Sequence, residues 1–425
     1  MGNVKDFNGV IVEMSALVNV PPSALNRGEF GEIKTCSFGN IPRTRVSSQS
    51  QKYAMKQSSL FKELSEGIGL CVRSANLHKG IIKAFPEILD MHKNASIVLM
   101  NLCDDLGKKP KKSSVTYNTA KDIFDFSKIT EKELKDKIEK IEDLEANSER
   151  NAQIIVSSQE EFDLLIETII KLVKDCEGDI AKFACVSNKL VFERMAAFNV
   201  NKVNLDNALF GSMSASPYSS TLPAAMSVAD MISTNEHIPE TDFFIASDDF
   251  NVDSNAAASM GNTEFASSCY YKYAVIDVGL LRDTLSHHRN SNFEFDMEGD
   301  ISELVQDVVS VATRLFIESL PKGGQTNHLT SVKPDFVYVT VRDAKTSNSY
   351  TNAFVTPITT NASGNLIENS IKAIVREINK LEIGYADESV TTKSFCMNFA
   401  TDDIPEYAKS VNNITELINE MKSLI

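Results

Sequence analysis

Apolar residues are grouped along the chain into a few stretches that predict β-strands. Residues 7–18 (FNGVIVEMSALV) are rich in β-branched and apolar side chains and are followed by Pro21 and Pro22, where we expect the strand to have ended. Val, Tyr and Phe dominate residues 270–278 and 336–341, which predicts two more strands. The predicted strands are therefore far apart in the sequence.

The region between these strands has a helical pattern. From about residue 60 to 200, apolar residues recur every three or four positions, and charged residues occupy many of the positions between them. Two capping boxes predict helix starts, Thr130 with Glu133 and Ser158 with Glu161. We expect amphipathic helices whose apolar sides pack together.

Other helices are predicted around the strands. Ser47 and Ser48 can cap a helix that begins near Gln49. Further helices are expected around residues 224–232, 301–317 and 367–378, and a last one near Pro405. A β-sheet domain interrupted by a helical insertion is an α+β arrangement, and this is the predicted fold class.

The composition narrows the possible functions. Of the 425 residues 42% are hydrophobic, and 43 Lys and Arg against 58 Asp and Glu give a net charge of −15. This charge argues against a surface that attracts nucleic acid everywhere, although a local basic stripe remains possible. The seven cysteines include no CxxC pair, and we find neither a signal pattern nor an apolar run of membrane-spanning length. We expect a cytoplasmic protein with reduced thiols and with no metal or other cofactor.

One segment has the opposite charge from the chain as a whole. Residues 27–56 carry six basic side chains and two acidic ones, a net charge of +4. The basic residues are Arg27, Lys34, Arg43, Arg45, Lys52 and Lys56. On the predicted helix, Gln49, Lys52 and Lys56 share one face, next to the first backbone N–H groups and several serine hydroxyls. Such a segment can hold the phosphates of a nucleic acid without reading its bases, but a solvated basic face has the same composition.

Several motifs along the chain resemble those of the CasC family, whose members form the repeated backbone of type I-E CRISPR surveillance complexes (Cascade). The motifs are LNR at 25–27, FG at 38–39, RTRVSSQSQKYAMKQS at 43–58, ALFGSM at 208–213, AAMSVADMISTNE at 224–236, ETDFFIASDDF at 240–250, GNTEFASSCYYKYAVIDVGLL at 261–281, PDFVYVTVRD at 334–343 and NAF at 352–354. They follow the family's order, which makes the resemblance specific. Residues 60–200 and the C-terminal tail carry little of it.

The resemblance implies an RRM-like (ferredoxin-like) palm with a large helical finger insertion and a protruding thumb loop. The implied parts are a palm at 1–59 and 201–345, a finger at 60–200, a thumb at 236–266 and a C-terminal helical segment at 346–425. It further implies a non-catalytic subunit that polymerises along a crRNA, holds its backbone and presents its bases to target DNA in antiviral defence. The implied partners are crRNA, target DNA, further copies of the chain and subunits of the CasA, CasB, CasD and CasE type, with no membrane.

The resemblance also suggests RNA-binding residues, position by position. The family's backbone contacts fall on Arg27, Lys34, Gln49, Lys52 and Lys56, and the same signature contains Arg43, Arg45, Ser47, Ser48 and Ser50. Met213 matches an apolar wedge that presses on a base, and Phe244 in the thumb is a second candidate, although either could be a core residue. Weaker candidates in a Gly-containing loop are Lys322, Gln325, Asn327 and His328.

Two positions depart from the family pattern. Ser212 stands where the family commonly has Arg, and Tyr53 follows Lys52 where a basic residue is frequent. Both differences lower the local positive charge. Arg43, Arg45 and the basic loop GKKPKK at 107–112 could compensate, although such a loop can also be merely solvated.

A metal-dependent, RNA-cleaving backbone subunit of a related CRISPR effector is the alternative function. Asp242, Asp248, Asp249 and Asp253 could bind Mg²⁺, and related subunits of type III complexes cut RNA with a single Asp. No motif positions a general base or a nucleophile, however, so no catalytic residue is predicted. A third possibility is a structural filament protein that binds no RNA, against which the basic segment argues.

Overall fold

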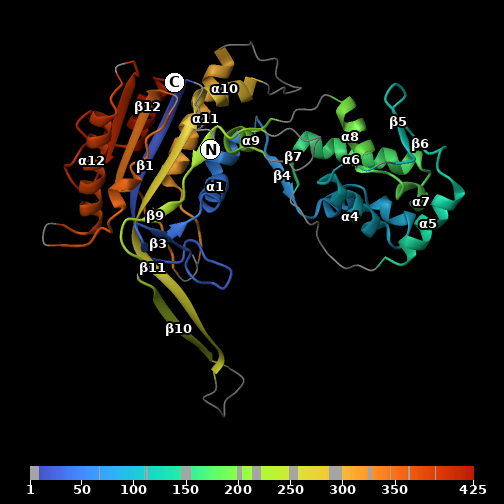
Figure 1. Ribbon diagram of the computed structural model, residues 1–425, viewed down its shortest axis with the longest axis horizontal. Helices are drawn as coiled ribbons and strands as arrows, with labels where there is room; N and C mark the ends of the chain where they lie inside the picture. The colour runs from blue at the N-terminus through green and yellow to red at the C-terminus, as the bar shows by residue number, and fades with distance from the viewer. Residues whose placement is uncertain are drawn as a thin grey trace. The chain divides into compact units, whose positions relative to one another are not determined.

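The computed structural model describes residues 9–66, 68–109, 111, 113–144, 155–198, 203–212, 222–247, 257–286, 299–323, 328–344, 346–361, 364–387 and 389–425. The chain divides into two compact units (Figure 1). The sheet unit comprises residues 1–64, 225–283 and 295–425, and the helical unit comprises residues 65–224 and 284–294.

Within the described residues, the sheet unit contains one ten-stranded sheet. Its strands are β1 (Val10–Ser23), β2 (Thr35–Phe38), β3 (Ile41–Val46), β8 (Met226–Val228), β9 (Met231–Ser233), β10 (Glu240–Ser247), β11 (Ala257–Asp277), β12 (Phe336–Asp343), β13 (Thr392–Asn398) and β14 (Ala408–Ser410). The order is β14-β13-β12-β1-β11-β9-β3-β2, with β8 and β10 also paired to β11. The four neighbours β12, β1, β11 and β9 pair antiparallel, and β14 is parallel to β13.

Helices cover both faces of this sheet. Those that belong wholly or mostly to the unit are α1 (Ser48–Lys56), α2 (Ser59–Ser65), α10 (Val278–Ser286), α11 (Gly299–Glu318), α12 (Leu366–Gly384) and α13 (Ile414–Lys422), with a 3-10 turn at Thr351–Phe354. Successive strand residues point to opposite faces. Leu17 and Tyr271 pack with Ile371 of α12 in one buried cluster, and Val18 and Tyr270 belong to another. The sheet is therefore buried between α12 on one face and the layer containing α11 on the other (Figure 1).

The first strand is longer than predicted. It passes through Pro21 and Pro22 and ends at Ser23, and its register with β11 shifts between Val20 and Ser23. Because a proline has no N–H to donate to the ladder, the irregularity lies where the two prolines occur. The other predicted strands are confirmed as parts of β11 and β12.

Two expectations for this unit are wrong. The helix expected around 224–232 is replaced by β8 and β9, two three-residue strands that pair with β11. The C-terminal residues 346–425 are not a separate helical segment, because β13 pairs with β12 along its whole length and extends the sheet. In both cases the local sequence pattern is compatible with more than one secondary structure, and pairing with a distant strand determines which one forms.

The helical unit has its own core. Its elements are β4 (Cys71–Ser74), α3 (Leu77–Ala84), a 3-10 turn (Pro86–Met91), α4 (Ala95–Leu106), β5 (Thr116–Asn118), β6 (Ile123–Asp125), α5 (Glu131–Glu142), β7 (Ile155–Ser158), α6 (Gln159–Asp175), α7 (Ile180–Phe183), α8 (Asn188–Ala197) and α9 (Leu205–Phe210). The pairs β4–β7 and β5–β6 form two small sheets that the helical prediction omitted. Leu99, Ile169 and Val191 come from three different helices and lie in one buried cluster. The insertion is thus an independent, mainly helical unit.

The two predicted helix starts differ in detail. The Ser158 box is complete, with the Ser158 hydroxyl accepting from the Glu161 N–H and the Glu161 carboxylate accepting from the Ser158 N–H. Thr130 caps α5 through the Glu133 N–H, but the Glu133 carboxylate accepts from the hydroxyl of Ser114 instead. Among the helices described here, none is long and apolar enough to cross a membrane.

Candidate nucleic-acid interface

Helix α1 carries the central part of the predicted interface. Ser47 is its N-cap, and the Ser47 hydroxyl accepts from the Ser50 N–H at 3.4 Å. Gln51 and Met55 are buried, and the Gln51 amide donates to the Ala229 carbonyl at 2.8 Å. These inward contacts fix the rotation of the helix about its axis. The opposite side of α1 is therefore the side available to a ligand.

That outer side contains the predicted helical contacts. Gln49 is exposed, and Lys52 and Lys56 are half-buried, as are Ser48 and Ser50. All nine residues of α1 are neutral or basic. The predicted one-sided arrangement of Gln49 and the two lysines is confirmed, whereas their contact with RNA stays a prediction.

The N-terminus of α1 is occupied by a carboxylate of the protein itself. One oxygen of Asp230 accepts from the Ser48 N–H at 2.8 Å, and the other pairs with the Arg45 guanidinium at 2.8 Å. An anion at a helix N-terminus is stabilised by the helix dipole and the unpaired N–H groups. The Ser48 N–H is therefore already taken by Asp230, and Arg45 is already paired with the same carboxylate, while contact of this terminus with a phosphate stays a prediction.

Arg43 is a structural residue rather than a surface cation. It is fully buried, and its two terminal nitrogens donate to four backbone carbonyls at 2.8–3.2 Å. Those carbonyls belong to Ser233, Thr234, Phe354 and Val355. Burial lowers the pKa of Arg43 from its usual value. The expectation that Arg43 contacts RNA is wrong, because its donors tie β9 to the 3-10 turn and do not reach the surface.

A tight loop before β2 places two further cations beside α1. The Lys34 N–H donates to the Asn26 carbonyl at 3.0 Å, and Arg27 and Ile33 form an isolated bridge across the loop. The Asn26 side chain accepts from the Ser47 N–H at 3.0 Å, which ties the loop to the start of the helix. Arg27 is exposed and Lys34 is half-buried. The loop and α1 thus form one continuous surface.

The predicted Gly-containing loop approaches the same surface. A side chain at Gly323 would collide with the carbonyl oxygens of Ala24 and Leu25, so only glycine fits where this loop crosses the end of β1. Lys322, next to it, is exposed. The His328 ring lies 5.5 Å from the Phe265 ring of β11, centroid to centroid. Two other candidates, Gln325 and Asn327, lie outside the described residues.

The predicted thumb is a two-stranded hairpin of β10 and β11. Phe244 is 47% exposed and pairs with Gly261. The Phe244 ring lies over Gly261, where any side chain would collide with it. Phe243, Ile245 and Met260 are each more than half exposed and share the opposite face. The hairpin therefore presents apolar side chains on both faces. Phe244 is not a core residue.

Some candidates cannot be placed. Met213, Asp248, Asp249 and Asp253 lie outside the described residues. In the part of the chain that the structure describes, no group of three or more His, Cys, Asp or Glu side chains could hold a metal ion.

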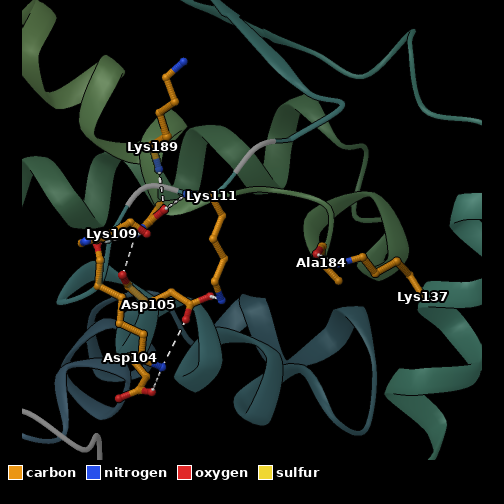
Figure 2. A network of polar contacts seen from close by, with 9 residues as sticks. Asp104, Asp105, Lys109, Lys111, Lys137, Ala184 and Lys189 are labelled. Atoms are coloured by element: carbon orange, nitrogen blue, oxygen red, sulfur yellow. Dashed lines mark hydrogen bonds and ion pairs between the residues drawn. The ribbon is translucent and has the colours of Figure 1, made fainter.

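The predicted basic loop of the helical unit is anchored by its neighbours (Figure 2). The Lys111 ammonium pairs with the Asp105 carboxylate at 2.5 Å. The Asn188 amide donates to the Asp105 carbonyl at 2.7 Å, and its oxygen accepts from the Lys111 N–H at 3.1 Å. Pro110 and Lys112 lie outside the described residues. The Lys111–Asp105 ion pair balances part of the positive charge of the loop. Contact of the loop with nucleic acid stays a prediction.

Sequence reasoning missed two residues that organise this surface. Asn26 lies inside the LNR motif, and Asp230 lies inside AAMSVADMISTNE. Both residues stand inside family motifs, which could have marked them as important. Their roles were not predictable, because the residues that they bind lie 21 and 182 positions away along the chain. Only the folded structure shows that both residues hold the start of α1.

Comparisons with known proteins agree with this architecture. The family model of the CT1975-like protein matches residues 12–422, and no curated protein matches the chain. A chain from a "CRISPR RNA-guided surveillance complex, pre-nicking" has a TM-score of 0.68 and 19% identity, covering 97% of this chain and 99% of that chain. A second, from a "CRISPR RNA-guided surveillance complex", has a TM-score of 0.64 and 17% identity, covering 98% and 100%.

These two solved structures show that the fold of this chain is shared. The assignment of the chain to a family rests on the family model. The matched range contains every motif on which the resemblance to CasC rests, so that prediction is confirmed. The chain belongs to the family of CT1975-like proteins.

Proposed function

We propose that this chain is a non-catalytic, crRNA-binding backbone subunit of a type I-E CRISPR surveillance complex. It holds the phosphates and sugars of the guide and leaves the bases free to pair with target DNA. Sequence recognition then belongs to base pairing, as in other guided effectors. Family membership supports this proposal, as do the two similar chains, which come from CRISPR RNA-guided surveillance complexes.

One observation carries the proposal. Ala24, Ile33 and Ala266 form a small buried cluster that joins the 26–34 loop to the base of the hairpin, next to Phe265 and the loop that ends at His328. The cations in this region are Arg27, Lys34 and Lys322, and Lys52 and Lys56 follow on α1. Cations beside an apolar hairpin suit a single strand, whose phosphates need charge and whose bases need flat apolar partners.

The sheet supports an RRM-like palm within the proposal. The order β12-β1-β11-β9 is antiparallel, with α1 between β1 and β9 in sequence and α11 between β11 and β12. This connectivity is the β-α-β-β-α-β pattern of ferredoxin-like folds. We take β10 and the part of β11 that pairs with it, residues 257–265, as the thumb, and the helical unit as the finger.

Polymerisation along the guide is part of the same proposal. The hairpin exposes Phe243, Ile245 and Met260 on the face opposite Phe244, and such side chains are unfavourable in water unless covered. A further copy of the chain on the guide would cover them. The CasA, CasB, CasD and CasE type subunits are proposed to complete the complex.

Replacement of the α1 lysines tests the proposal. Lys52→Glu with Lys56→Glu should abolish stable binding of a fluorescent single-stranded RNA in an anisotropy titration. Each lost phosphate contact should reduce the slope of log affinity against log salt by roughly 0.7. The matched control is Lys132→Glu with Lys135→Glu, the same charge change on exposed positions of α5. Wild-type affinity in the α1 variant across the salt series would refute the proposed interface.

A further inference from the structure

An exposed tyrosine lies within the cationic side of α1. Tyr53 is 63% exposed, although tyrosine is a large and mainly apolar side chain. At about 100° per residue, Lys52, Lys56, Gln49 and Tyr53 span an arc of roughly 100° on the helix. Gln51 and Met55 are buried on the opposite side. The ring therefore belongs to the ligand-facing side.

The neighbours of Tyr53 indicate what kind of partner it fits. On the helix surface, Gln49 precedes it by four residues and Lys56 follows it by three, so both are its direct neighbours. Helix α1 contains no acidic residue. A basic protein surface is disfavoured here by charge, whereas a polyanion with flat apolar parts is complementary in both charge and shape.

We propose that the Tyr53 ring stacks on a base or sugar of the RNA strand whose phosphates are held by Lys52 and Lys56. The inference rests on the proposed function and adds a contact of another kind. Stacking is nearly independent of salt because no counterion is released, and it tolerates any base because every base has an aromatic face. Tyr53 would therefore let the subunit hold RNA of any sequence at salt concentrations that weaken the lysine contacts.

Affinity measurements separate stacking from charge. Tyr53→Ala should weaken RNA binding roughly five- to 150-fold at every salt concentration, because the loss of one stacked base lowers affinity by about that factor. The salt slope should not change. Tyr53→Phe keeps the ring and should bind within about twofold of wild type, because stacking needs no hydroxyl. Tyr385→Ala is the matched control, since Tyr385 is 75% exposed at the end of α12. It should bind as wild type does.

The absence of tryptophan from the chain allows a direct test of stacking. Tyr53→Trp creates a single-tryptophan protein, and its emission should be quenched when single-stranded RNA is added. Tyr385→Trp should show no change. Unquenched emission at saturating RNA, or wild-type affinity of Tyr53→Ala, would overturn the inference. So would a salt slope that falls by roughly 0.7, which indicates a lost phosphate contact.

The outcomes also distinguish this inference from the proposed function. If Tyr53→Ala binds RNA normally but fails to assemble with other copies, the residue docks protein and the inference is wrong. If Lys52→Glu with Lys56→Glu also binds normally, the proposed function fails as well. Loss of binding in the lysine variant alone would leave the proposed function intact and remove only the role of Tyr53.

Discussion

A buried lysine makes the stability of the sheet unit depend on pH. Lys272 of β11 is 1% exposed, and its ammonium donates to the carbonyls of Phe316 and Ser319 at the end of α11. Burial, and secondarily the charge of Lys333, lowers the pKa of Lys272 from 10.5 to about 7. A neutral amine still has two N–H groups for the two carbonyls, so the deprotonated form fits the site.

The sign of the effect follows from proton binding. Below about pH 7 the lysine is protonated in both states, and the folded protein carries the full cost of burying the charge. Between about pH 7 and 10.5 the unfolded chain holds one more proton, so the free energy of unfolding rises with pH. At about 1.36 kcal/mol per pH unit the limit is about 5 kcal/mol, of which about 2–3 kcal/mol falls between pH 7 and 9.

Urea unfolding from pH 6 to 9 measures this effect. Lys272→Met is the comparison, because it retains much of the side-chain length without a titrating group. Its loss of donors to Phe316 and Ser319 lowers stability by an amount that does not change with pH. The difference in free energy of unfolding between wild type and Lys272→Met should therefore increase with pH in favour of wild type. A difference that stays constant across the range would refute the reasoning.

Two further predictions separate structural from RNA-contacting residues. Arg43→Lys should lower the free energy of unfolding by about 2–4 kcal/mol, because one ammonium cannot serve the four carbonyls that the guanidinium reaches. Urea unfolding measures this loss, and RNA affinity of the folded variant should equal wild type; a stable variant with weak binding would reinstate Arg43 as a ligand. Phe244→Ala should change stability by less than about 1 kcal/mol, since the ring is 47% exposed, yet alter the fluorescence of 2-aminopurine in bound RNA. A large loss of stability with unchanged fluorescence would make the ring a packing residue only.

The sequence predicted the elements whose signals are local. Helix α1 begins where Ser47 can cap it, and the long buried strands β11 and β12 show as apolar runs. The alternation of helical and strand regions also gave the division into a sheet and a helical insertion. Short strands such as β8 and β9 have three residues each, too few for any periodicity, and they exist because β11 pairs with them.

The interface was only partly predictable for a similar reason. Arg43 and Arg45 are two residues apart on one strand and look equivalent in the sequence. Arg43 is buried because carbonyls from residues about 190 and 311 positions later surround it, and Arg45 is neutralised by Asp230. A count of charged residues treats both arginines as available to a ligand. Only the tertiary partners show that the cationic surface consists of fewer residues than the sequence suggests.

The affinity of wild-type protein for several RNAs of equal length and unrelated sequence tests the central claim most directly. Fluorescence anisotropy at one defined salt concentration is sufficient, with protein first freed of any co-purified nucleic acid. If the surface holds phosphates, sugars and base faces, the affinities should agree within a few-fold. Undetectable binding, or a preference of roughly 30-fold for one sequence (about 2 kcal/mol), would contradict the account, because the latter requires readout of base edges.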